Sequence, residues 1–384
     1  MNGRRVAAVV SKEWREIVRD RLFLALAFVV PSMLMLLFGY GLSLDVENIP
    51  FAIVDYDNSA TSRDYAYRFI DSRYFDFQGY TRDESALARK LSTNELRAYI
   101  VIPEHFERRL LNGSPVAVQT MLDGTFPSRA ETTKGYVIAI NSAYSMELLA
   151  RFAAARRGIS EQQAAAALTP VRLDVRYLFN QSLSSIWSIA PKLIMVILMV
   201  SPPFLTALGV VREKERGSIY NIYASTVTRT EFLVGKILPY VGISLVNAGI
   251  LWALATWHFG APFKGDFVFF LLASLIYVVC TTGIGLIVSV VVKTQVAAMV
   301  VTAIVTVVPA ALYSGVLIPI PSLSGQAQVI AHLLPAMYYA NIVTGTFLKG
   351  AGLETLWRDV AVLSAYGALL LAVGFLMFSK RPRS

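Results

Sequence analysis

The sequence predicts an α-helical polytopic membrane protein with six transmembrane helices and an inserted extracytoplasmic α/β domain. Two observations carry this prediction. Hydrophobic residues make up 55% of the 384 residues and charged residues only 16%, a balance seldom found in soluble domains. Six apolar runs also reach the length of about 20 residues that a helix needs to cross a bilayer. They lie at residues 22–44, 186–211, 232–257, 266–292, 297–318 and 357–378.

Positive charge sets the expected orientation. Outside residues 45–185, fifteen lysines and arginines fall on one side of the predicted membrane and four on the other. Because cytoplasmic loops carry the excess of basic residues, both termini of this multi-pass membrane protein are expected in the cytoplasm. Residues 45–185 then form an extracytoplasmic domain, and residues 379–384 a cytoplasmic tail. The first apolar run is too long for a signal peptide and is followed by no cleavage motif, so residues 22–44 are expected to stay as transmembrane helix 1.

Residues 1–21 are predicted to form an amphipathic helix on the cytoplasmic face of the membrane. Val6, Val10, Trp14, Ile17 and Arg21 fall near one helical stripe, while most other charged residues of this segment lie elsewhere on the helix. The alternative is a solvated basic leader.

The 45–185 segment alternates strand-like and helix-like patterns. Strands are expected at the start of residues 50–60 and at 74–80, 97–103 and 116–122, with helices at about 60–72 and 83–96. Such alternation indicates an α/β domain with a mainly parallel sheet. A long alanine-rich helix is expected over about 128–157, either as ordinary domain packing or in a sensing role. With Cys280 as the single cysteine, an intrachain disulfide is excluded and the domain must be held by its core.

Residues 319–350 interrupt the apolar pattern after the fifth run with Pro319, Pro321, Pro335 and several glycines. A single helix across lipid is excluded there, because proline removes backbone hydrogen bonds and hydrocarbon offers no replacement partner. We predict short broken helices at the outer face that line a path or cap a partner. A plain connector is the alternative.

Several classes of chemistry are absent from the sequence. It contains no G-x-x-x-x-G-K-(S/T) loop, so the chain is not expected to bind ATP. His105, His258 and His332 lie far apart and near no metal-spaced cluster, hydrolase motifs are missing, and no basic patch with interleaved aromatics suggests nucleic acid. We therefore predict no catalytic residue, metal or cofactor in this chain, and no nucleic-acid partner.

Ionisable residues in the predicted spans lie near helix ends rather than near helix centres. They are Lys192, Lys236, Asp266, Arg358 and Asp359. A proton-coupled transporter would need such a group deeper in the membrane. The energy for transport is therefore expected to come from another polypeptide.

The densest charge cluster lies in residues 212–231, between the second and third spans. Thr228 and Glu231 have the spacing of a capping box, which would start the third span. Tyr220 and Tyr223 lie between the charges, and exposed aromatics of this kind are typical of a docking site for a soluble partner. The alternative is a solvated loop held by its basic residues to anionic membrane lipid.

With these residues the chain resembles the ABC-2 type transport permeases, membrane subunits of bacterial ABC exporters, in the subgroup with a large domain between helices 1 and 2. The family pattern is (R/K)-E-(K/R)-E-x-G-(S/T), then (S/T)-R-x-E, then G-K-x-x-P. The matching segments here are REKERGS at 212–218, TRTE at 228–231 and GKILP at 235–239. The resemblance covers nearly the whole chain. The sequence departs from the family pattern at Thr226, where the family often has proline, and at Tyr220 and Asn221, which replace a common Glu-Gln pair.

The resemblance implies a half-transporter that pairs with a second permease subunit, identical or different, and is driven by a separate ATP-binding subunit holding ATP and Mg. A periplasmic adaptor protein is a further implied partner of the external domain. The expected cargo is hydrophobic or amphiphilic, drug-like or lipid-like. The residues implied in coupling to the ATPase are Arg212, Glu213, Lys214, Glu215, Arg216, Gly217, Ser218, Tyr220, Tyr223, Arg229 and Glu231, with Gly235, Lys236 and Pro239 as a helix-entry motif.

Two other functions compete with an exporter. A receptor or sensor would bind a ligand with the external domain and signal through the 212–231 loop. A secondary transporter would follow the proton gradient, and the lack of buried charge near helix centres weighs against it.

Overall fold

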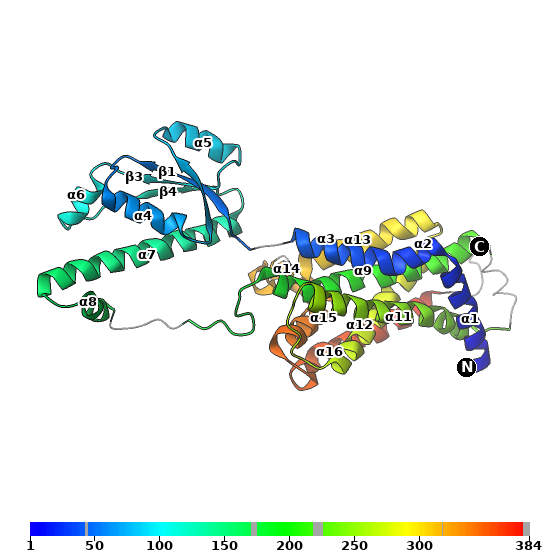
Figure 1. Ribbon diagram of the computed structural model, residues 1–384. Helices are drawn as coiled ribbons and strands as arrows, with labels where there is room; N and C mark the ends of the chain where they lie inside the picture. The colour runs from blue at the N-terminus through cyan, green and yellow to red at the C-terminus, as the bar shows by residue number, and fades with distance from the viewer. Residues whose placement is uncertain (43–44, 170–174, 218–225, 317, 379–384) are drawn as a thin grey trace. The chain divides into compact units, whose positions relative to one another are not determined.

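The chain forms two structural units, Met1–Leu44 with Arg176–Ser384, and Asp45–Val175. The computed structural model describes residues 1–42, 45–169, 175–217, 226–316 and 318–378. Figure 1 shows the elements of each unit. The first unit holds the long apolar helices, and the second holds the only sheet among the described residues.

Six helices of the first unit are long and apolar enough to cross a membrane, which confirms the predicted number of spans. The first combines α2 (Arg21–Leu24), η1 (Ala25–Val29) and α3 (Val30–Gly41), and the third combines α11 (Arg229–Ala253) and η2 (Leu254–His258). The others are α9 (Ser185–Glu215), α12 (Phe267–Val291), α13 (Gln295–Tyr313) and α16 (Leu353–Met377).

Helix ends differ from the prediction where polar contacts or glycine decide them. Helix α9 continues to Glu215, four residues past the predicted end, because Arg212 to Glu215 find partners on neighbouring helices. Helix α13 ends at Tyr313 rather than 318, since Gly315 follows with φ +79°, a left-handed conformation that ends a helix.

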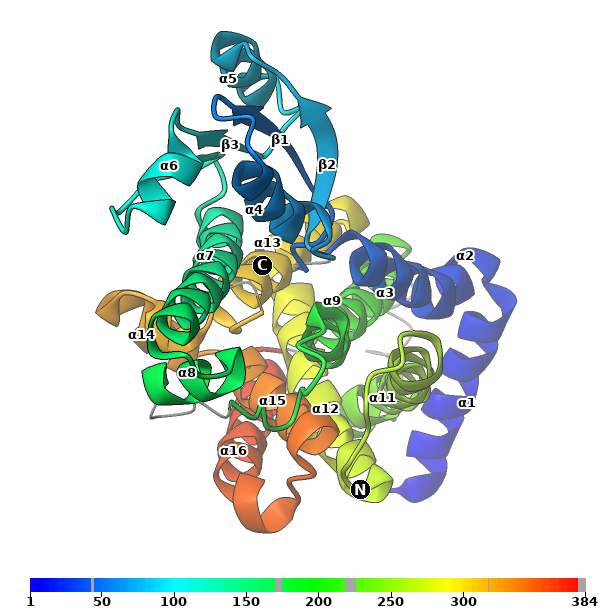
Figure 2. The same cartoon turned by 60° about the vertical axis from the view of Figure 1, so that its left-hand side comes forward.

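Helix α9 is the centre of the first unit. It packs against α3, α11, α12, α13 and α15, as Figure 2 makes visible, and most of its residues are buried. Its contact with α12 is unusually close: a Cβ added to Gly285 would lie 2.4 Å from the Pro203 carbonyl oxygen. Glycine at this position lets the two backbones approach.

The predicted broken segment is a chain of short helices: η3 (Ile320–Ser322), α14 (Gly325–His332), α15 (Pro335–Thr344) and η4 (Gly345–Lys349). Helix α15 is more than a surface cap, because Tyr339 and Phe347 of this segment are fully buried in the helical core. The Tyr339 ring stacks on Tyr277 with centroids 4.1 Å apart, and its hydroxyl lies 2.7 Å from Ser274 Oγ.

Helix α1 (Gly3–Arg19) lies beside α11 at the end of the unit where α9 ends and α11 begins (Figure 1). The predicted helix is present, but its buried face is not the predicted stripe. Val6 and Ile17 are buried together with Glu13, whereas Trp14 is 50% exposed. An acidic residue occupies this face because its partners lie on α9 and α11.

The second unit contains a four-stranded sheet in the order β2-β1-β3-β4. Strands β1 (Ile49–Asp55), β2 (Phe75–Tyr80) and β3 (Ala98–Ile102) are parallel, and β4 (Gln119–Leu122) pairs antiparallel to β3. The mainly parallel sheet was predicted, although β4 begins three residues later than expected. Strands β1 and β3 are buried on both faces, as nearly continuous apolar strands usually are.

Five helices accompany the sheet: α4 (Ala60–Ile70), α5 (Glu84–Ser92), α6 (Phe106–Leu111), α7 (Pro127–Arg157) and α8 (Glu161–Leu168). One face of the sheet packs with Tyr65 and Phe69 of α4 and with Val137 and Tyr144 of α7. The other packs with Leu87 of α5. The long helix is where the sequence predicts it, whereas α6 and α8 were not predicted.

The close contact of α9 and α12 generates a prediction about stability. Gly285→Ala forces a Cβ against the backbone of Pro203, which cannot move aside as a flexible side chain would, so unfolding should become easier by about 1–3 kcal/mol. Thermal unfolding of the purified protein in detergent measures the effect. Gly242→Ala in α11 is the matched control, because nothing lies within 4 Å of its added Cβ. Equal unfolding temperatures for the two variants would contradict this account of the contact.

Candidate functional site: a charged network around the first helix

The predicted coupling residues that the structure describes lie at the end of α9 and the beginning of α11. Arg212 to Glu215 form the last turn of α9, Arg216 is its C-cap, and Gly217 follows with φ +73°. Arg229 and Glu231 lie in the first turn of α11, with Gly235, Lys236 and Pro239 in the next two turns. Ser218, Tyr220 and Tyr223 lie outside the described residues. The described members of the predicted set therefore all lie at or near these two helix ends.

Lys236 is the centre of the site. Its Nζ atom lies 2.8 Å from Glu13 Oε2 and 3.2 Å from Glu213 Oε1, so one ammonium group joins α11 to both α1 and α9. The side chains of Lys236 and Glu13 are each 1% exposed, and that of Glu213 is 5% exposed. Tyr240, one turn further along α11, donates its hydroxyl hydrogen to Glu13 Oε1.

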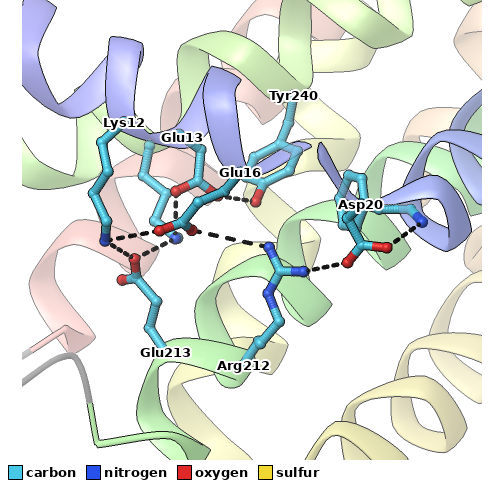
Figure 3. A network of polar contacts seen from close by, with 9 residues as sticks. Lys12, Glu13, Glu16, Asp20, Arg212, Glu213 and Tyr240 are labelled. Atoms are coloured by element: carbon cyan, nitrogen blue, oxygen red, sulfur yellow. Dashed lines mark hydrogen bonds and ion pairs between the residues drawn. The ribbon is translucent and has the colours of Figure 1, made fainter. Parts of the chain in front are cut away.

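A second layer of charges surrounds this core at the surface of the unit. Lys12 Nζ lies 2.6 Å from Glu213 Oε1 and 3.6 Å from Glu16 Oε1. Arg212 Nη1 lies 2.7 Å from Asp20 Oδ2, and Arg212 Nη2 lies 4.0 Å from Glu16 Oε2 (Figure 3). We call the set Lys12, Glu13, Glu16, Asp20, Arg212, Glu213, Lys236 and Tyr240 the α1 network.

Asp20 has a further role in the α1 network. Its Oδ1 atom accepts a hydrogen bond of 3.1 Å from the Phe23 amide and so caps the first turn of α2. The Arg212 guanidinium lies 5.6 Å from the centre of the Phe23 ring, a cation–π contact. The junction between α1 and the first span is therefore fixed to the end of α9.

The arrangement fits the physics of buried charge. Isolated ionised groups cost several kcal/mol each to bury, and the cost is offset only when partners and hydrogen bonds are well placed. Here each buried charge faces an opposite one. Burial alone would lower the pKa of Lys12, but its hydrogen bond with Glu213 and the charge of Glu213 outweigh that effect and raise the pKa. Lys12 therefore stays protonated across the physiological range.

Close helix packing brings these groups together. A Cβ added to Gly235 would lie 2.8 Å from Val9 Cβ on α1, and one added to Gly209 would lie 1.8 Å from the Tyr240 hydroxyl. The glycine of the GKILP motif thus lets α1 approach α11. The lysine of the same motif then reaches the acids on α1 and α9.

Glu231 fastens the beginning of α1. Together with Thr228 it forms the predicted capping box, and it also accepts a 2.6 Å hydrogen bond from the Asn2 amide. Arg5 Nη1 lies 3.8 Å from Glu231 Oε2 and donates to the Thr226 carbonyl at 2.7 Å. Neighbouring Arg229 has its Nη2 atom buried, with no hydrogen-bond acceptor among the described residues.

Lys214 and Glu215 point to another part of the bundle. Lys214 Nζ donates to the carbonyl oxygens of Ser289 and Val290, at the C-terminal end of α12. Positive charge is favourable there because the last carbonyls of a helix carry partial negative charge. Glu215 accepts a 2.6 Å hydrogen bond from the side chain of Gln295 at the start of α13.

The carboxylates of Glu13, Glu16 and Glu213 lie close enough to hold a metal ion, with ligand atoms within 4.8 Å of one another. However, the ammonium groups of Lys12 and Lys236 lie among them. These two cations supply the positive charge that a metal would otherwise bring, so the cluster is best described as an ion-pair network.

Sequence reasoning singled out Arg212, Glu213 and Lys236 for another role, but it missed Tyr240 and the members contributed by residues 12–20. It placed residues 1–21 on the membrane face, and it placed Lys236 near a helix end without a partner. A signal was available: Glu13 falls on the same helical face as Val6 and Ile17, where a carboxylate needs a buried cation.

Comparison with known proteins gives a consistent picture. A family model described as ABC-2 family transporter protein matches residues 21–376. The chain is 27% identical over 382 residues to the "Probable multidrug ABC transporter permease YbhS" of Escherichia coli K12, covering 99% of this chain and 98% of that protein. It is 25% identical to the "Probable multidrug ABC transporter permease YbhR" (98% and 99% covered) and 25% identical to the "Inner membrane transport permease YhhJ" (86% and 85%) of the same strain.

The buried core of the α1 network yields a second prediction. Lys236→Met removes the cation between Glu13 and Glu213, and breaking a buried pair in this way typically costs about 3–5 kcal/mol. Thermal unfolding of the purified protein should register this loss, and adding Glu13→Gln should recover part of it. Lys12→Met is the control, because its half-exposed ion pair should cost about 1 kcal/mol or less. A Lys236→Met variant no less stable than Lys12→Met would contradict the assignment.

Proposed function

The chain belongs to the ABC-2 family of transporter proteins, and on that premise we propose that it is the membrane-spanning permease subunit of an ABC exporter. Its cargo is a hydrophobic or amphiphilic molecule, drug-like or lipid-like. Support for this cargo class comes from the relatives YbhS and YbhR, whose names describe multidrug permeases. The chain carries no P-loop motif, so the ATP and Mg of the transport cycle belong to a separate ATP-binding subunit.

The observation that carries the proposal is the α1 network itself. Three helices that meet at one end of the bundle, α1, α9 and α11, are joined close to the two ends of the 212–231 segment by the buried ion pairs of Lys236 and by the more exposed pair of Arg212 with Asp20. A force applied to that segment by a soluble subunit reaches all three helices at once. Exposed Arg216 and the partly buried Arg229 lie at its two edges, where an acidic groove could contact them.

The proposed cycle needs two arrangements of the helices. A second permease subunit, identical or different, would complete the path, and ATP binding would favour one pairing of the helices while hydrolysis restores the other. The end that holds α1 is the cytoplasmic end in this proposal, and the protein spans the cell inner membrane with both termini in the cytoplasm. The Asp45–Val175 unit is then the extracytoplasmic α/β domain, available to a periplasmic adaptor protein.

A third prediction tests the coupling. The two variants are Gly217→Pro and Glu215→Lys. Gly217 adopts φ +73°, which proline cannot reach because its ring holds φ near −65°, and Glu215→Lys reverses a charge in the last turn of α9. Both variants should insert and retain the second permease subunit but lose most ATP turnover stimulated by amphiphiles, and lose transport. The measurements are ATPase activity and efflux of the complex purified with its ATP-binding subunit.

The matched control is Glu354→Lys, the same charge reversal at an exposed residue in the first turn of α16, at the opposite end of the bundle. It should leave coupled ATP turnover unchanged. Full activity of both the Gly217→Pro and the Glu215→Lys variant would rule the proposal out. Purification of the permease without any ATP-binding subunit would do the same.

A further inference from the structure

A cavity of about 410 Å³, with polar and apolar lining residues, lies at the end of the bundle opposite the α1 network. It is bounded by the second turn of α9, the first two turns of α16, the residues after α13, and the α15–η4 segment. Its polar walls come from Lys192, Asn341, Thr344, Lys349 and Asp359. None of these residues belongs to the coupling site, and Lys192, Thr344 and Asp359 are partly buried while Asn341 and Lys349 are exposed.

Lys192 is the central group of this cavity. It lies in the second turn of α9 and is partly buried, and its Nζ atom donates a 2.9 Å hydrogen bond to the Gly315 carbonyl. Across the described ranges no carboxylate lies within ion-pairing distance of this ammonium group, in contrast to Lys236, which has two. A partly buried ammonium with only a neutral acceptor still has two hydrogens to donate and an uncompensated charge.

Other polar groups of the cavity also favour a bound hydrogen-bond acceptor with negative charge. Thr344 Oγ1 is buried and has no hydrogen-bond partner within the described part of the chain. Lys349 adds a second cation, while Asp359 accepts a 3.1 Å hydrogen bond from the Asn341 amide. Two cations and one carboxylate leave a net charge of +1 on the cavity wall. One negative charge would balance it.

Apolar residues complete the wall. Pro319, Ile320, Ala340 and Leu356 line the same cavity, beside the positive and hydroxyl groups. A fully hydrated small anion gains little from such surfaces, whereas a molecule with an anionic head and a hydrocarbon part can use both. We propose that this cavity binds the singly negative head group of an amphiphile, a phosphate, sulfate or carboxylate. The Lys192 ammonium group is the principal contact of the bound anionic head group, and Lys349 and Thr344 are additional hydrogen-bond donors to it.

The competing account is a lysine that merely extends its ammonium group to the membrane surface, as lysines near helix ends do. Such a lysine would show no preference for a bound anion. Lysophosphatidylglycerol and lysophosphatidylcholine with the same acyl chain separate the two accounts, because only the first carries a net negative head group.

The experiment measures binding of fluorescent lysophosphatidylglycerol to the purified permease in a nonionic detergent. Lys192→Gln should weaken binding about tenfold, and Thr344→Val about threefold, while lysophosphatidylcholine should bind weakly to every variant. Lys264→Gln is the matched control, since Lys264 also donates to a backbone carbonyl, that of Phe179, at 3.1 Å but lies outside the cavity. Equal binding by Lys192→Gln and Lys264→Gln, or equal binding of the two lipids, would overturn the proposal.

The bound anionic amphiphile is either a bilayer lipid that stays bound or the exported cargo. Only the second rests on the proposed exporter function. The test uses the complex with the ATP-binding subunit. If lysophosphatidylglycerol stimulates ATP turnover and Lys192→Gln abolishes that stimulation, the bound amphiphile is exported cargo. Binding that depends on Lys192 without such stimulation identifies a resident lipid, and either result supports the site. Because the binding assay needs no ATPase, its failure is distinguishable from failure of the exporter proposal.

Discussion

The buried ammonium group of Lys236 constrains much of the structure around it. A lysine that is 1% exposed must have anionic partners, and its two partners come from different helices, Glu13 on α1 and Glu213 on α9. Satisfying both requires α1 to lie against α11, which in turn requires a glycine at position 235. The last turn of α9 must also stay helical so that Glu213 faces inward. The charge of Lys236 thereby constrains the position of α1, the end of α9 and the placing of Gly235 directly before Lys236 in the GKILP motif.

The two ends of the bundle treat charge differently. Within the α1 network each buried charge meets an opposite charge, which gives a set of contacts with one favourable arrangement. At the other end, the only hydrogen-bond partner of the Lys192 ammonium group among the described residues is a backbone carbonyl, that of Gly315. An end with its charges paired suits the transmission of force, whereas an end with an unpaired cation suits the reception of a ligand. The division of roles proposed for the two ends follows from this difference.

How far each feature could be predicted depends on the range of the interactions that determine it. The six spans, the capping box of Thr228 and Glu231 and the long helix α7 were predictable, because apolar length, local spacing and helix propensity act within a few residues. The role of Glu13 was not, because its partners are more than 200 residues away. The burial of Tyr339 within a proline-interrupted segment likewise depends on Tyr277 and Ser274 of another helix.

Helix α9 links the two functional ends within a single element. Lys192 and Arg212 are twenty residues apart on it, which corresponds to about 30 Å along a continuous helix. Between them Pro202 and Pro203 lack the amide hydrogens that would bond to the preceding turn, so the helix is weakened near its middle. The backbone contact of Gly285 with Pro203 supports α9 at that point from α12. A push on the α1 network is therefore expected to tilt the two halves of α9 about this proline pair, and a ligand at Lys192 would respond to the same movement.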